Sequence, residues 1–313
     1  MKIVVVEPLD VEKEQLLAMA ASQLPADAEL VLFEDRAKTD EELIQRAADA
    51  EVVVIANQKI SDQVLEGWKN MKMLTVAFTG TDHVNVEWCH QKGIPVCNCA
   101  GYSTEAVADI VFAMTIDLLR NIVPCDTVVR QGGTKAGLVG CELAGKRFGV
   151  VGTGAIGSRV AKIADAFGCE VVAYSRTKKE GLPVTYMSLE ELMSTSDIVS
   201  LHVPVTPQTK GMINRQLLEM MKPTAYLINT ARGPVVDTQA LADVLQSGGI
   251  AGAGVDVFDT EPPIPAENPL LSAPHTVLTP HIAFASKEAF VKRAKIVFEN
   301  IHRWLEGCPQ NIV

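Results

Sequence analysis

Short apolar runs rich in β-branched residues recur along the chain, and segments of helical length separate them. This alternation is typical of parallel βαβ units, in which a crossover helix returns the chain to the same end of the sheet. The first series of runs is Ile3–Val6, Val52–Ala56, Leu74–Phe78 and Pro95–Cys99. The second series is Phe148–Val151, Glu170–Tyr174, Ile198–Leu201, Ala225–Asn229, Gly252–Val257 and Thr276–Leu278. We therefore predict an α/β protein with two doubly wound, Rossmann-like domains, the second containing six strands.

Two long segments with helical spacing flank the second series. One runs from Tyr102 to Arg120, with Ser103 or Thr104 as its N-cap, and the other from Lys287 to Trp304. Glycines in the stretch 131–137 predict a loop after the first of these helices. The length of 313 residues exceeds that of one ordinary core and agrees with two domains.

Composition and charge exclude several classes of protein. A formal charge of −10 argues against wrapping nucleic acid or lying on an anionic membrane. The first residues do not resemble a signal peptide, and no apolar run is long enough for a transmembrane helix. The seven cysteines are odd in number and contain no Cys-x-x-Cys, so we expect reduced thiols in a cytoplasmic protein and no metal site.

The stretch Gly152-Thr153-Gly154-Ala155-Ile156-Gly157 follows a predicted strand and opens a predicted helix. In this position the first glycine permits a tight turn, the second allows close approach of a pyrophosphate, and the third lets helix and strand pack. The pattern alone is weak, because three glycines also occur in ordinary turns. Its place between a strand and a helix predicts a dinucleotide site.

The next strand predicts which dinucleotide binds. NAD-binding proteins place an acidic residue about 20 positions further on, where it holds the ribose 2′-hydroxyl. Here Ser175, 18 residues after Gly157, is followed by Arg176, Thr177, Lys178 and Lys179. Hydroxyls and cations suit a 2′-phosphate, so we expect NADP(H) to be favoured, with NAD(H) possible. The alternative is a solvated basic loop.

Three residue types suited to one reaction follow the later strands: Arg232 in Asn229–Gly233, Glu261 after Asp256–Phe258, and His281 after Pro280. A 2-keto acid needs a forked cation for its carboxylate and carbonyl. The carbonyl oxygen needs a proton donor that titrates near neutrality, and a carboxylate beside a histidine supports the imidazolium. Each residue alone has a common structural explanation. Together, behind a dinucleotide loop, they predict a catalytic set, with Arg232 and His281 also binding substrate.

Seven sequence blocks in order resemble the D-isomer-specific 2-hydroxyacid dehydrogenase family, most closely its glyoxylate and hydroxypyruvate reductases. The blocks are Thr79–Val84, Gly101–Asp109, Gly152–Gly157, His202–Pro204, Asn229–Gly233, Asp256–Phe258 and Thr279–Ala283. The resemblance implies reversible reduction of a 2-keto acid to the (R)-2-hydroxy acid, with the histidine as proton donor.

The resemblance also implies a domain plan and a set of ligand contacts. A flavodoxin-like substrate domain, residues 1–98 and 285–313, would contain an inserted cofactor domain, residues 99–284, through which a homodimer forms. Backbone N–H groups at Thr79 and Gly80 would hold the substrate carboxylate. The positions expected to line the cofactor, besides Gly152, Gly154, Gly157 and Ser175–Thr177, are Thr104, Ala155, Ile156, Val203, Pro204, Thr209, Thr230, Ala231, Asp256 and Ala283.

The chain departs from the family pattern at three places. The usual acidic residue after the second strand is absent, the loop 131–140 lacks a tryptophan often found there, and Asn85 stands where aspartate is common. Two alternatives remain open: D-3-phosphoglycerate dehydrogenase, and a non-catalytic, dinucleotide-sensing corepressor. The intact arginine, glutamate and histidine set argues against the second. Glu261 argues against a formate dehydrogenase, which carries glutamine there.

Overall fold

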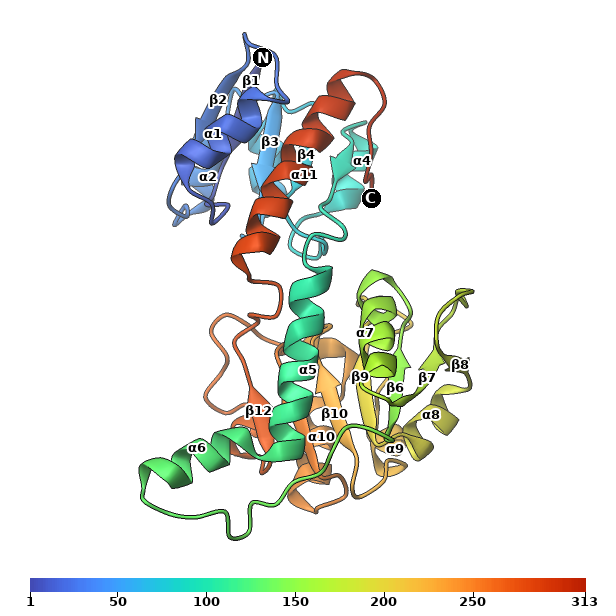
Figure 1. The fold of residues 1–313 in the computed structure, drawn as a ribbon. Coiled ribbons are helices and arrows are strands. Elements are labelled where there is room, and N and C mark those ends of the chain that lie inside the picture. The colour runs from blue at the N-terminus through green and yellow to red at the C-terminus, as the bar shows by residue number, and fades with distance from the viewer. The chain divides into compact units, whose positions relative to one another are not determined.

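Twelve parallel strands form two separate sheets, each within its own compact unit (Figure 1). The computed structural model describes all 313 residues. Unit 1 comprises Met1–Ser103 and Ala285–Val313, and unit 2 comprises Thr104–Phe284, so unit 2 is inserted into unit 1. The first boundary lies after Ser103, five residues later than the expected boundary after residue 98. The reason is that Cys99, Tyr102 and Ser103 are buried within unit 1.

Unit 1 contains a five-stranded sheet in the order β2-β1-β3-β4-β5, which is the flavodoxin-like order. β2 was not predicted, because this edge strand is short and only partly buried. The strands are β1 (Lys2–Val5), β2 (Glu29–Leu32), β3 (Val52–Ile55), β4 (Met73–Val76) and β5 (Val96–Cys97). The helices are α1 (Lys13–Ala21), α2 (Asp40–Arg46), α3 (Asp62–Gly67), α4 (Val86–Gln91) and α11 (Lys287–Leu305).

Unit 2 contains a seven-stranded sheet in the order β12-β11-β10-β9-β6-β7-β8. The predicted fold class is confirmed, but the predicted count of six strands is wrong, because two-residue β8 has no apolar run. The strands are β6 (Arg147–Val151), β7 (Glu170–Tyr174), β8 (Thr185–Tyr186), β9 (Ile198–Leu201), β10 (Tyr226–Asn229), β11 (Gly252–Val255) and β12 (Thr276–Leu278). The helices are α5 (Thr104–Arg120), α6 (Ile122–Arg130), α7 (Ala155–Ala166), α8 (Leu189–Thr195), α9 (Arg215–Glu219) and α10 (Thr238–Gln246), with 3₁₀ turns η1 (Gly233–Val235) and η2 (Pro269–Ser272).

Both faces of the unit 2 sheet are buried, which explains its nearly continuous apolar strands. Alternate residues of one strand enter different cores, as Val150 and Val151 of β6 do. Val150 packs with residues of α5 and α7, and Val151 packs with residues of α8, α9 and α10. Helices on both faces leave the two ends of the strands as the places where side chains can meet a ligand.

Helix α6 contributes no buried residue, unlike the other helices of unit 2. In Figure 1 it extends sideways from the lower end of α5. The segment after it, predicted as a loop, contains no helix or strand before β6. None of the helices in the chain is long and apolar enough to span a membrane.

The glycine loop joins β6 to α7 through a close backbone approach. Gly152 has a φ of 97°, a conformation that side chains rarely adopt. A Cβ atom on Gly157 would lie 1.9 Å from the carbonyl oxygen of Gly152, whereas one on Gly154 would meet nothing within 4 Å. Gly157 therefore allows α7 to pack closely against the turn at Gly152. Gly154 instead has open space where a side chain would be.

Replacing these two glycines with alanine should have different effects. Gly157→Ala must displace backbone, and we expect a loss of about 1–3 kcal/mol in unfolding free energy. Gly154→Ala should leave the melting temperature of the ligand-free protein unchanged but weaken dinucleotide binding, because its methyl group enters the open space. Thermal unfolding and cofactor titration of both variants test this. A wild-type melting temperature for Gly157→Ala would contradict the packing role.

Candidate active site

The three predicted catalytic residues follow three neighbouring strands of unit 2. β10 pairs with β11, and β11 pairs with β12, all in parallel. Their carboxyl ends therefore lie next to one another, and the chain segments leaving them carry Arg232, Glu261 and His281.

His281 and Glu261 form a direct pair. The Nδ1 atom of His281 lies 2.6 Å from the Oε1 atom of Glu261, and both side chains remain partly exposed. The other carboxylate oxygen of Glu261 accepts a hydrogen bond of 3.0 Å from the backbone N–H of Phe258. The ring of Phe284 meets the imidazole edge-on, with centroids 5.6 Å apart. With Nδ1 facing the carboxylate, Nε2 is the ring nitrogen that can exchange a proton with a ligand.

The turn that carries His281 is held by the fully buried carboxylate of Asp256. This carboxylate accepts hydrogen bonds from the backbone N–H groups of Ile282 (2.8 Å) and Ala283 (2.9 Å), and from the hydroxyl of Thr279. His281 itself has a φ of 51°, and its N–H donates to the carbonyl of Asp256 at 2.7 Å. Asp256 thus fixes an uncommon backbone conformation at the histidine.

The Arg232 turn packs directly against the chain that leads to Glu261. A Cβ atom on Gly233 would lie 2.1 Å from the carbonyl carbon of Phe258, so only glycine allows this approach. The Asn229 side chain closes the turn, accepting from the N–H of Ala231 at 3.1 Å and donating to the carbonyl of Arg232 at 3.0 Å. Arg232 is partly exposed, and one of its terminal nitrogens donates to the carbonyl of Ala231 at 2.8 Å.

The residues expected to line the cofactor are consistent with a bound dinucleotide in two respects. Gly154 has the open space that a pyrophosphate requires. Thr230, at the carboxyl end of β10, has a buried hydroxyl without a hydrogen-bond partner. Buried hydroxyls are usually hydrogen-bonded, so this one is suited to bind a polar group of a ligand. Ala155 and Ile156 form the first turn of α7, and Thr104 begins α5. Thr209 donates a hydrogen bond of 2.6 Å to the carbonyl of Pro204 in the segment after β9.

His202, immediately after β9, packs against the glycine loop. Its carbonyl oxygen would lie 2.6 Å from a Cβ atom on Gly152. Its Nε2 atom is 2.9 Å from the hydroxyl of Ser200, and burial lowers the pKa of His202 to about 3. The ring is therefore neutral at physiological pH and serves as packing beside the loop.

The basic segment Ser175–Lys179 leaves the carboxyl end of β7, next to the glycine loop. The N–H of Thr153 donates to the hydroxyl of Ser175 at 3.4 Å. Arg176 and both lysines are exposed, and Arg176 has neither an ion pair nor a hydrogen bond within the chain. Nowhere in the chain do three or more His, Cys, Asp or Glu side chains form a group that could hold a metal ion.

Thr79 and Gly80 lie in unit 1, immediately beyond β4. The side chain of Asn98 donates a hydrogen bond of 2.8 Å to the carbonyl of Thr79 and thereby orients this peptide. Because a trans peptide points its N–H away from its C=O, the N–H of Gly80 faces away from Asn98. The N–H of Gly80 is therefore not used by Asn98.

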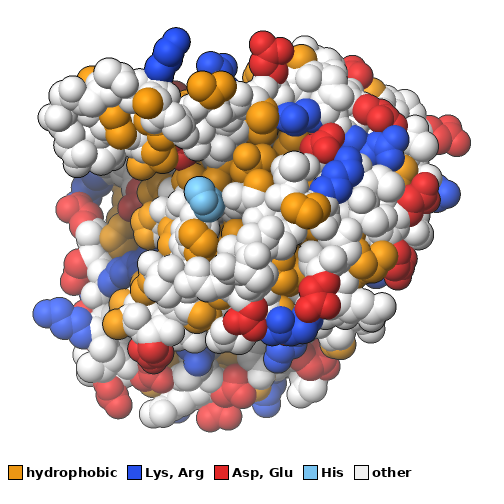
Figure 2. All heavy atoms as spheres, turned by 90° about the horizontal axis from the view of Figure 1, so that it is seen from below, with side chains coloured by type: hydrophobic (Ala, Val, Ile, Leu, Met, Phe, Trp, Pro, Cys, Tyr) orange, Lys and Arg blue, Asp and Glu red, His pale blue; other side chains and the backbone are white.

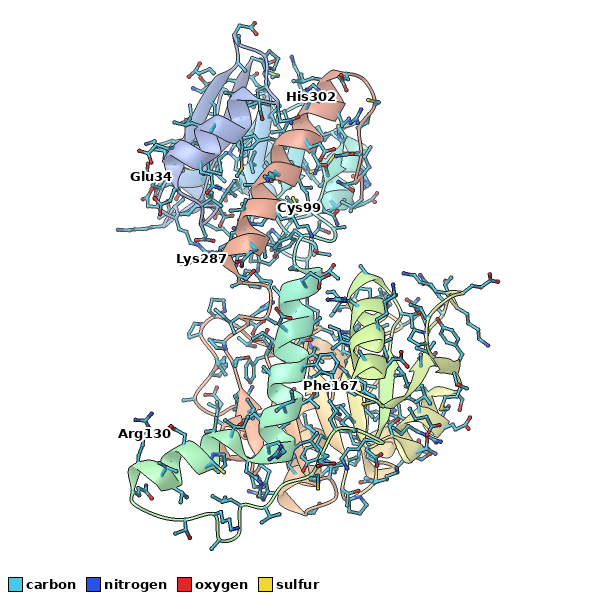
Figure 3. The ribbon with its side chains drawn as sticks, viewed as in Figure 1. Glu34, Cys99, Arg130, Phe167, Lys287 and His302 are labelled. Carbon is cyan, nitrogen blue, oxygen red and sulfur yellow. The ribbon has the colours of Figure 1, made fainter.

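A buried cluster around Arg293 was missed by the sequence analysis. Arg293, on α11, is 1% exposed and lies over the rings of Phe78, Tyr102 and Phe290 at 4.7–5.9 Å. Its guanidinium donates to the carbonyl of Leu9 at 2.7 Å, and Cys99 contacts the same turn of α11 (Figure 3). Phe78 and Tyr102 are thus part of the unit 1 core, in contact with the segment that holds Thr79.

Asn85, where the family commonly has aspartate, is explained by its neighbours. Its side chain caps α4 by accepting from the N–H of Trp88 at 3.0 Å, and it donates to the carboxylate of Asp62 at 3.0 Å. An aspartate would place two carboxylates together, so the amide suits this pair.

The chain resembles one family of known proteins over most of its length. Residues 112–283 match the model for the NAD-binding domain of D-isomer-specific 2-hydroxyacid dehydrogenases. The chain is 36% identical over 301 residues to the hydroxypyruvate reductase of Blautia hydrogenotrophica, covering 93% of each chain.

Solved structures also resemble the chain over nearly its whole length. An acyclic imino acid reductase in complex with NADPH and D-Arg has a TM-score of 0.91 and 32% identity, covering 100% of both chains. The D-lactate dehydrogenase of Aquifex aeolicus, complexed with NAD and lactic acid, has a TM-score of 0.82 and 31% identity, covering 98% of this chain and 96% of that one. The family resemblance read from the sequence blocks is confirmed, and the chain belongs to the D-isomer-specific 2-hydroxyacid dehydrogenases, which are nicotinamide-dependent oxidoreductases.

Proposed function

We propose that the protein reduces a small 2-keto acid reversibly to the (R)-2-hydroxy acid, with His281 as the proton donor. The observation that carries this proposal is the 2.6 Å contact between His281 and Glu261 at the carboxyl ends of the unit 2 strands. A carboxylate beside one ring nitrogen of a histidine stabilises the imidazolium and leaves the other nitrogen to deliver a proton. The hydroxypyruvate reductase and D-lactate dehydrogenase among the similar proteins support this substrate class.

In the proposed mechanism, Arg232 binds the carboxylate and carbonyl of the substrate through its forked guanidinium. The substrate contacts expected at Thr79 and Gly80 belong to unit 1 and stay a prediction. The bound nicotinamide cofactor supplies the hydride. His281 gives the Nε2 proton to the carbonyl oxygen, while Glu261 stabilises the imidazolium and keeps Nδ1 protonated. In the reverse direction the neutral imidazole removes the hydroxyl proton.

Removing the imidazole tests the proton-transfer role. His281→Ala should lower kcat by about 10²–10⁴-fold, the usual contribution of a general acid, with cofactor affinity nearly unchanged. Steady-state assays at 340 nm and cofactor titration measure the two effects. His275→Ala is a matched control, because His275 is exposed at the other end of β12 and also has a positive φ. Wild-type turnover by His281→Ala would refute the mechanism.

We further propose that the cofactor is NADP(H). The support is the unpaired Arg176, with two neighbouring lysines and no acidic residue at the end of β7. A carboxylate there would repel a 2′-phosphate, whereas a guanidinium binds it with charge-assisted hydrogen bonds. Both NADPH and NAD occur in the similar solved structures.

The preference is tested by comparing KM for NADPH and NADH. Wild-type protein should favour NADPH, and Arg176→Ala should raise KM for NADPH about 10- to 100-fold while sparing NADH, because a hydrogen bond to a charged group contributes about 1.5–3 kcal/mol. Arg215→Ala, on α9 and paired with Asp243, is the matched control. A wild-type enzyme that prefers NADH would overturn the assignment.

The proposed assembly is a homodimer formed through α6. This helix and the segment after it expose four large apolar side chains, which are Ile122 (50%), Val123 (61%), Val129 (72%) and Val139 (85%). Figure 2 shows the molecule from below, where hydrophobic side chains are interspersed with charged ones. Arg130, at the end of α6, pairs only with Asp126 of the same helix (Figure 3). Exposed apolar side chains, with the two charges of the helix paired to each other, suit a self-complementary contact between two copies.

Charges placed on α6 should separate the two copies. The double variant Val123→Glu/Val129→Glu should be monomeric, because carboxylates would be buried without partners. Light scattering coupled to size exclusion gives the mass of each species. Leu271→Glu, at an apolar position of unit 2 that is 49% exposed, is the control. A wild-type monomer of 33.7 kDa, or a dimeric double variant, would rule out this interface.

A second candidate reaction is the reduction of 2-imino acids. The likeness to the acyclic imino acid reductase favours it, because hydride transfer to C=N needs the same proton donor as transfer to C=O. Assays of glyoxylate, hydroxypyruvate and larger 2-keto acids, each with and without ammonia, distinguish the two reactions. The two alternatives, D-3-phosphoglycerate dehydrogenase and a non-catalytic dinucleotide sensor, are tested by the same assays, because a sensor would show no turnover. The cytoplasmic location stays a prediction that cell fractionation tests.

A further inference from the structure

The segment Ser175–Lys179 is fixed by a tyrosine on the strand that the sequence did not predict. Tyr186 lies on β8, which pairs in parallel with β7 at the edge of the unit 2 sheet. Its hydroxyl accepts a hydrogen bond of 2.8 Å from the backbone N–H of Lys179. The same hydroxyl donates to Thr153 of the glycine loop, with an oxygen–oxygen distance of 3.2 Å. One phenolic oxygen therefore joins β8, the basic segment and the glycine loop.

Thr153 and Ser158 complete the connection. The Thr153 hydroxyl is 3.4 Å from the carbonyl of Thr177, and the Thr153 carbonyl accepts from the hydroxyl of Ser158 at 2.9 Å. The ammonium group of Lys179 donates to that hydroxyl at 3.4 Å. The basic segment is thus tied at Thr177 and Lys179 to the glycine loop and to the first turn of α7.

The cations of this segment have different surroundings. The ammonium of Lys178 lies 5.8 Å from the centre of the Tyr186 ring, within the range of a cation–π contact. Lys179 reaches the start of α7. Arg176 alone has no partner in the chain. The network therefore holds the backbone on both sides of Thr177 and leaves one forked cation available beside the glycine loop.

We propose that Tyr186 is a positioning residue for cofactor specificity, because it pre-organises Ser175–Lys179 to bind the 2′-phosphate of NADP(H). This inference rests on the proposed preference for NADP(H). A loop that is already ordered loses less conformational freedom when a ligand binds, so its cation contacts yield more affinity. Tyr186 lies on β8, the edge of the sheet opposite β12, far in strand order from the strands that precede Arg232, Glu261 and His281. Its effect should therefore be confined to the phosphate that distinguishes the two cofactors.

The test is the binding of NADP⁺ and NAD⁺, which differ only in the 2′-phosphate, to Tyr186→Phe. The substitution removes the hydroxyl and keeps the ring beneath Lys178. Loss of one or two neutral hydrogen bonds should weaken NADP⁺ binding about 5- to 20-fold and change NAD⁺ binding less than about twofold. Tyr226→Phe is the control, because Tyr226 lies at the amino end of β10. Isothermal titration gives both dissociation constants, and thermal unfolding checks that each variant is folded.

The possible results are distinct. Selective loss of NADP⁺ binding supports the inference. If the variant binds both cofactors equally more weakly, Tyr186 is a general structural residue and the proposal fails. If neither dissociation constant changes, the proposal fails as well. If wild-type protein binds NAD⁺ at least as tightly as NADP⁺, the cofactor assignment itself fails, and that failure is visible before any variant is measured.

Discussion

The buried carboxylate of Asp256 is the interaction on which the proposed catalytic geometry depends. It is fully buried, and it is stabilised by two backbone N–H groups and one hydroxyl, all from Thr279–Ala283. A buried carboxylate without such donors would be costly, so this turn and Asp256 require each other. The turn holds His281 at a positive φ and brings its Nδ1 atom to Glu261. The strands bring His281 and Glu261 to the same end of the sheet, and the Asp256 carboxylate orients the turn that carries His281.

Close backbone packing provides a second constraint at the same end of the sheet. Gly233 permits the Arg232 turn to rest on Phe258, whose N–H in turn holds one oxygen of Glu261. Short contacts therefore link three successive strand ends, through Gly233 against Phe258 and through the Asp256 carboxylate with the turn after β12. Groups held in this way need little reorganisation when a ligand binds, which is what transfer of a proton in step with a hydride demands.

The glycine loop and the basic segment Ser175–Lys179 are also held by close backbone packing and hydrogen bonds. The glycine loop packs on His202, whose lowered pKa keeps it neutral, and on the first turn of α7. Tyr186 and Thr153 then connect this loop to the basic segment after β7. In the proposed binding mode, two elements share cofactor recognition: a loop common to dinucleotide-binding sheets, and an edge strand whose tyrosine hydroxyl contacts the neighbouring basic segment.

The sequence alone determined the α/β class, the two series of strands, the glycine loop and the candidates Arg232, Glu261 and His281. These features depend on local periodicity and on residue types at strand ends, which neighbouring positions specify. It did not reveal β2 or β8, because short edge strands with little apolar burial give no periodic signal. It gave no indication of the Arg293 cluster either.

Only the tertiary structure decided how distant residues combine. The Tyr186–Thr153 contact spans 33 residues, the Asp256–Ala283 contact spans 27, and the contact of Arg293 with Leu9 spans 284. Which ring nitrogen of His281 faces Glu261, and which oxygen fixes the basic segment, follow from such contacts. They depend on the packing of whole strands and helices, and no local pattern in the chain encodes them.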